Sequence, residues 1–69
     1  MTKQEEVQEL YDKYNRFKET AEQHTFPMLL ALDAKLVPAY NDLQVNWSDD
    51  HADIFIRCMR MVFDKFGIK

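Results

Sequence analysis

The chain has 69 residues, of which 46% are hydrophobic and 30% charged, with a formal net charge of −3 at pH 7. This length and composition predict a single folded domain over residues 1–69, which the patterns below make helical, and exclude both a disordered chain and a chain of several domains. The single cysteine excludes an internal disulfide. Because one hydrophobic core is barely sufficient at this length, we expect tight helix packing or self-association to add stability.

The first segment carries a helix start signal followed by one apolar stripe. Thr2 and Glu5 have the spacing of a capping box, in which the Thr2 hydroxyl accepts from the Glu5 amide and the Glu5 carboxylate accepts from the Thr2 amide. Apolar residues then recur at alternating intervals of three and four, which predicts an amphipathic helix over residues 3–24. The predicted stripe consists of Val7, Leu10, Tyr14, Phe17, Ala21 and His24, with Tyr11 at its edge.

A second helix is predicted over residues 27–43. Pro27 suits the first turn of a helix, where its missing amide would have no intrahelical partner. Pro38 lies further along, removes one helical hydrogen bond, and is expected to kink or split the helix. This helix is apolar on two opposite sides, so we expect it at the centre of the fold. One side has Leu29, Leu32, Leu36, Ala39 and Leu43, and the other has Phe26, Leu30 and Val37.

A third helix is predicted over residues 49–66, with Ser48 as its N-cap, two aspartates in its first turn and Gly67 as its C-terminal stop. On the polar side we expect i,i+4 ion pairs between Asp53 and Arg57 and between Arg60 and Asp64. Its main buried face is expected to contain Ala52, Phe55, Ile56, Met59, Val62, Phe63 and Phe66.

Together these patterns predict an all-α fold, a small three-helix bundle with Trp47 covering one end of the core. Three further apolar residues of the third helix, Ile54, Cys58 and Met61, lie on a flank beside the charged side. A three-helix bundle has only one interior, so we expect this flank and the outer side of the second helix to be solvent-exposed. The alternative is that the loop or the bent half of the second helix buries Ile54 and Met61.

Sites for chemistry are not evident in the sequence. Asp49, Asp50, His51 and Asp53 are clustered in the sequence, and His24 could approach them from the end of the first helix. Helix capping already explains these carboxylates at the start of the third helix, so we expect no metal or other cofactor. Cys58 has no neighbouring base and lies in mid-helix among apolar residues, where cysteines usually pack. We therefore expect a non-enzymatic protein without catalytic residues. A metal-binding helical protein is the third functional alternative.

A helix-turn-helix-like nucleic-acid-binding regulator is the second alternative, because such domains also have three short helices. The third helix would have to be the recognition helix. Its N-terminus carries Asp49 and Asp50, which repel phosphates, and its arginines are matched by aspartates. We therefore do not expect direct nucleic-acid binding.

The leading hypothesis is a non-catalytic protein-protein interaction module, a small acidic regulator, inhibitor or accessory protein that acts through an apolar helical surface and could form a homodimer. No apolar segment has the form of a secretion signal or a membrane span, so we expect a cytoplasmic protein with no membrane association. The residues expected to bind the partner are Leu30, Val37, Ile54, Arg57, Cys58, Arg60 and Met61.

Overall fold

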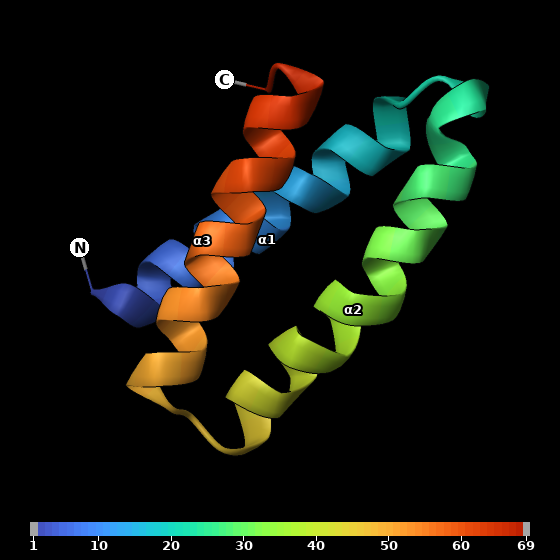
Figure 1. Ribbon diagram of the computed structural model, residues 1–69. Helices are drawn as coiled ribbons and strands as arrows, with labels where there is room; N and C mark the ends of the chain where they lie inside the picture. Colours follow the sequence, from blue (N-terminus) through green and yellow to red (C-terminus); the bar gives the residue numbers. More distant parts are fainter. Residues whose placement is uncertain (1, 69) are drawn as a thin grey trace.

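Three α-helices form the fold of a computed structural model, which describes residues 2–68 (Figure 1). They are α1 (Lys3–Thr20), α2 (Phe26–Val45) and α3 (Asp49–Phe66), and a short 3-10 helix, η1 (Gln23–Thr25), precedes α2. In Figure 1, α2 and α3 run antiparallel beside each other, and α1 crosses behind α3. The predicted all-α three-helix bundle is therefore confirmed.

The start of α1 follows the predicted capping box in part. The Thr2 hydroxyl accepts from the Glu5 amide at 3.2 Å, as expected for an N-cap. The Glu5 carboxylate, however, accepts from the Thr2 hydroxyl at 3.2 Å, where the sequence predicted a bond with the Thr2 amide. The Thr2 hydroxyl thus accepts a hydrogen bond from the Glu5 amide and donates one to the Glu5 carboxylate. The helix begins at Lys3, as predicted.

The end of α1 differs from the prediction, because the helix stops at Thr20 and not near residue 24. Ala21 is extended, with ψ of 146°, and the chain then forms η1, in which the Thr25 hydroxyl donates to the Glu22 carbonyl at 2.6 Å. This break lets the chain reverse direction, so that α2 returns along the bundle (Figure 1). His24 consequently lies exposed in the connection and does not extend the apolar stripe of α1.

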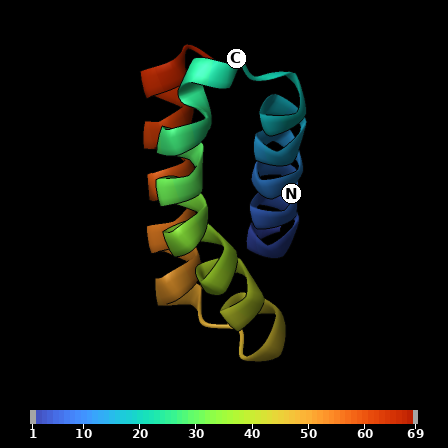
Figure 2. The same ribbon diagram turned by 90° about the vertical axis from the view of Figure 1, so that its right-hand side faces the viewer.

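Pro38 lies inside α2, which continues from Phe26 to Val45 without being split. Figure 2 shows the helix changing direction in its second half, as expected when a proline removes one hydrogen bond of the ladder. Pro38 and Ala34, whose carbonyl loses its intrahelical donor, are both exposed, so water can bind the freed carbonyl. The kinked alternative therefore describes α2, and its ends lie one and two residues beyond the predicted ones.

The boundaries of α3 agree with the prediction at both ends. The Ser48 hydroxyl accepts from the His51 amide at 3.4 Å, and Asp49 and Asp50 occupy the first turn, at the positive end of the helix dipole. Gly67 ends the helix in the left-handed conformation, with φ of 69°, and donates to the Phe63 and Asp64 carbonyls.

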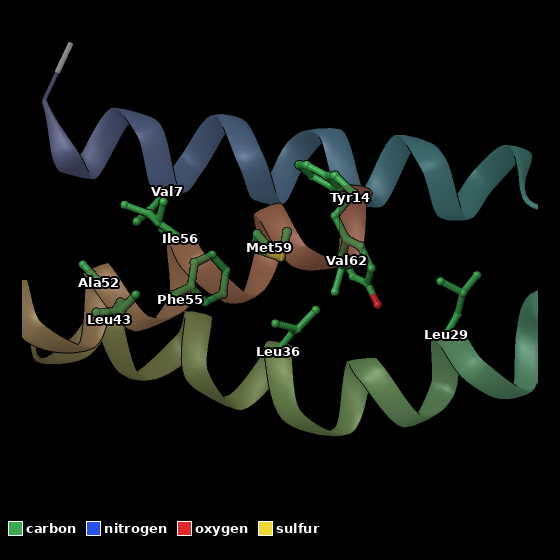
Figure 3. Close-up of a cluster of buried hydrophobic side chains, with 11 residues drawn as sticks. Val7, Tyr14, Leu29, Leu36, Leu43, Ala52, Phe55, Ile56, Met59 and Val62 are labelled. Atoms are coloured by element: carbon green, nitrogen blue, oxygen red, sulfur yellow. The ribbon is translucent and has the colours of Figure 1, made fainter. Parts of the chain in front are cut away.

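The central helix is α3, and not the second helix as the sequence suggested. It packs against both α1 and α2, and it contributes more buried side chains than either (Figure 3). The prediction failed because the second apolar side of α2 is left partly exposed, whereas α3 has a broad buried band. Trp47 is half-buried against one end of the core, as expected, and its Nε1 donates to Asp49 at 2.8 Å. The buried core consists of Val7, Tyr14, Leu29, Leu36, Leu43, Ala52, Phe55, Ile56, Met59, Val62 and Phe63.

The charged side of α3 is paired with α1 and not within itself. Lys3 Nζ lies 3.0 Å from Asp53 Oδ1, and the Arg60 guanidinium pairs with the Glu6 carboxylate. These contacts replace the predicted pairs of Asp53 with Arg57 and of Arg60 with Asp64, because α1 crosses α3 closely enough to offer partners of opposite charge. They join the two helices at their polar edge.

Polar and aromatic contacts join α1 to α2. The buried Tyr14 donates its hydroxyl proton to Asp33 at 2.6 Å, and Lys18 donates to the same carboxylate at 3.1 Å. Nearby, Tyr11 stacks on Tyr40 with 3.8 Å between ring centroids. Burial and the hydrogen bond with Asp33 both raise the pKa of Tyr14 above its ordinary value. This network fixes the side of α2 that faces α1.

Candidate protein-binding surface

A shallow apolar groove runs along the outer seam between α2 and α3, which we call the α2–α3 groove. It consists of two adjoining hollows of about 290 Å³ and about 270 Å³ that share Lys35, Leu36 and Cys58. The remaining lining residues are Leu32, Ala39 and Asp42 from α2 and His51, Ile54, Phe55, Met61, Val62 and Lys65 from α3.

The α3 wall of this groove is the apolar flank that the sequence predicted. Ile54, Cys58 and Met61 are four and three residues apart, so they form a stripe along one side of the helix. Ile54 is 58% exposed and Met61 67% exposed, and the Cys58 thiol is free and exposed. The alternative in which the loop or α2 buries this flank is therefore wrong.

The core lies directly under the flank. Phe55 and Val62 are buried side chains of α3, and Leu36 is a buried side chain of α2, yet all three also line the groove. The groove is therefore a place where the hydrophobic core reaches the surface without a covering helix. By contrast, α1 packs against α3 on another side and covers it.

Charged residues lie at both ends of the groove. Lys65 lines its wall near the end of α3, whereas Asp42 and His51 line it near the start of α3, with 4.0 Å between His51 Nδ1 and Asp42 Oδ2. Lys35 lies between them on α2, and its long aliphatic stem can cover apolar surface while its amine stays in water. The groove thus has Lys65 at one end, an apolar middle bordered by Lys35, and Asp42 with His51 at the other end.

The structure separates the predicted partner-binding residues into different parts of the surface. Arg57 and Arg60 line another hollow of about 430 Å³ on the polar side of α3, where Met61 forms the boundary with the groove. Leu30 is 69% exposed, but it lines a smaller hollow between α1 and α2. Val37 is half-buried on α2 and does not line the groove. Ile54, Cys58 and Met61 are therefore the predicted residues that line the α2–α3 groove.

Sequence reasoning missed the two polar positions that extend this surface. His51 and Lys65 continue the spacing of the flank by three residues before Ile54 and four residues after Met61. The heptad spacing was a signal for both positions, but His51 was considered only as a candidate metal ligand and Lys65 was not singled out. The contribution of α2 to the groove could not be found in the same way, since it depends on how the two helices pack.

The residues considered for metal binding have other partners. Asp49 accepts from Trp47, Asp53 pairs with Lys3, and His24 Nδ1 lies 3.2 Å from Glu22. Across residues 2–68 the structure brings together no group of three His, Cys, Asp or Glu side chains that could hold a metal ion.

Comparisons with protein-family models, curated proteins and solved structures found no match for this chain. Among the helices between residues 2 and 68, none is long and apolar enough to cross a membrane. The residues that line the α2–α3 groove, and their exposure, are therefore the basis of the function proposed below.

Proposed function

We propose that this protein is a non-catalytic protein-protein interaction module, a small regulator, inhibitor or accessory protein that binds its partner through the α2–α3 groove. The observation that carries the proposal is the exposed flank of Ile54, Cys58 and Met61 over a groove that opens onto the core. Full burial of a large exposed apolar side chain contributes at most roughly 1.5–3 kcal/mol. A protein that covers the flank therefore gains part of that free energy from Ile54 and from Met61, which are 58% and 67% exposed.

The composition of the surface supports a protein ligand over other classes. An apolar centre with a charged rim is the usual arrangement of a protein interface, whereas nucleic acid binding requires a surface rich in lysine and arginine. Asp49 and Asp50 at the start of α3 would repel phosphates. In a helix-turn-helix the two helices cross at about 90–120°, whereas α2 and α3 run antiparallel (Figure 1).

Site-specific photo-crosslinking in cells that naturally produce the protein tests this proposal. A photoreactive amino acid at position 61 is expected to give discrete protein adducts, because the Met61 side chain lies on the binding surface. The matched control carries the same amino acid at position 16, where Arg16 is exposed on α1 away from the groove. Equal adducts from both positions, or adducts from neither, would contradict the proposal.

A further inference from the structure

The α3 wall of the groove has a nearly symmetric order of residues about Cys58. Ile54 lies four residues before Cys58 and Met61 three residues after it, and His51 and Lys65 follow at the next positions of the same 3-4 spacing. Cys58 also lies near the middle of α3, which spans Asp49–Phe66. This is the heptad spacing with which two helices pack along a shared apolar seam.

We propose that the occupant of the α2–α3 groove is a second copy of this chain, related by a two-fold axis that passes near Cys58. This inference rests on the proposed function and names the partner. A two-fold axis across α3 reverses the helix, so Ile54 of each copy meets Met61 of the other, and the two Cys58 side chains lie near the axis. The α2 and α3 helices of each copy then cover Ile54, Cys58 and Met61 of the other.

The charges at the ends of the groove select the antiparallel arrangement. Lys65 lies at one end and Asp42 at the other, with Asp50 in the neighbouring first turn of α3. The two-fold axis brings each Lys65 toward the acidic end of the other copy, whereas a parallel pairing would place the two lysines together. The dipoles of the two α3 helices also oppose each other favourably in this arrangement.

A stable dimer of this chain requires an interface that uses both helices of the groove. A stable interface buries about 800 Å² per partner, which is about a sixth of the 4995 Å² surface of this chain. One helical stripe is too narrow for that area, but the α2 wall with Leu32 and Ala39 widens the surface beside the α3 flank. Dimerisation would also supply the additional stability that a chain of this length needs.

Sedimentation equilibrium of the purified full chain, from low to high micromolar concentration, tests the inference. The wild-type protein is expected to form a dimer, and Met61→Asp is expected to be monomeric because it places a carboxylate in the apolar seam. Circular dichroism should show unchanged helicity for this variant, since Met61 is 67% exposed in the monomer. A wild-type chain that stays monomeric throughout would overturn the inference.

Charge reversal tests the antiparallel arrangement with residues that are exposed in the monomer. Lys65→Glu and Asp42→Lys are each expected to weaken dimerisation roughly tenfold, because each places like charges together at two symmetric positions. The double variant is expected to recover most of the wild-type affinity. If the loss of dimerisation free energy in the double variant equals the sum of the losses in the two single variants, the two-fold arrangement is contradicted.

The two proposals fail in different ways. If the chain is monomeric but position 61 still crosslinks to a different protein in cells, the inference of a second copy is overturned and the proposed function remains. If the chain is monomeric and position 61 gives no adducts, both are overturned.

Discussion

Met59→Ala is expected to lower the free energy of unfolding by about 3 kcal/mol, within the usual range for truncating a buried methionine. Met59 is 0% exposed and lies on the face of α3 that α1 and α2 cover (Figure 3). The alanine would leave a cavity that the surrounding helices fill only in part. For a 69-residue chain with a total stability of roughly 3–10 kcal/mol, this loss would unfold a large part of the population on mild heating.

The matched control is Met61→Ala, which removes the same atoms from the same helix two positions further along. Met61 is 67% exposed, so its truncation is expected to change the free energy of unfolding by less than about 0.5 kcal/mol. Urea denaturation at a concentration at which sedimentation equilibrium shows the wild-type chain to be monomeric measures both values. Similar losses for the two variants would show that the assignment of buried and exposed faces on α3 is wrong.

Tyr14→Phe is expected to lower the free energy of unfolding by about 2 kcal/mol at neutral pH, the usual value for a hydrogen bond to a charged group. The Tyr14 hydroxyl donates to Asp33, whose carboxylate also accepts from Lys18, and the tyrosine side chain is fully buried. Phenylalanine keeps the packing but leaves the carboxylate short of one donor. Tyr40→Phe is the control, because the Tyr40 hydroxyl bonds to the exposed, uncharged Gln8 and should contribute less than about 1 kcal/mol.

The same network gives Tyr14 a dependence on alkaline pH. Burial, and then the hydrogen bond with Asp33, raise the pKa of Tyr14 above its ordinary value of 10.0, so the folded state holds this proton more tightly than the unfolded state. The contribution of the Tyr14 network to the free energy of unfolding is fully present below pH 10 and is lost as the pH rises above that value. Wild-type protein is therefore expected to lose more stability than Tyr14→Phe between neutral pH and the alkaline range. Parallel losses would contradict this role of the network.

Local signals were sufficient to predict the starts of the helices and the whole of α3. Ser48 and Gly67 bound α3 because an N-cap hydroxyl and a left-handed glycine act within a few residues of the chain. The buried face of α3 was predicted for the same reason, since helical spacing alone decides which side chains share a side. All but Phe66 of that face are buried, and Phe66 is half-buried.

Features that depend on packing between helices were not predictable from these signals. The break after Thr20 and the central position of α3 both depend on the path of the chain in space. The pairs of Lys3 with Asp53 and of Arg60 with Glu6 join residues about 50 positions apart, whereas sequence reasoning could see only the i,i+4 partners.

The candidate surface was predicted in part for the same reason. Ile54, Cys58 and Met61 were found because three apolar residues on the flank of an otherwise complete amphipathic helix have no place in its core. Leu30 and Val37 were grouped with them because both helices had spare apolar residues, but the structure turns that side of α2 away from the groove. Which side of α2 adjoins α3 is decided by tertiary packing.

The accessibility of the Cys58 thiol in the native setting tests most directly whether the α2–α3 groove is covered by protein. Cys58 is the single cysteine of the chain, is exposed, and lines both halves of the groove. Its reaction with a maleimide is expected to be roughly tenfold slower in fresh, undiluted extract of the native cells than in dilute purified protein, as expected when about nine-tenths of the chain is bound. A Glu9→Cys, Cys58→Ser variant, with its thiol exposed on α1, should react at nearly the same rate in both. Equal rates for Cys58 in extract and in dilute solution would contradict a protein-binding role for this surface.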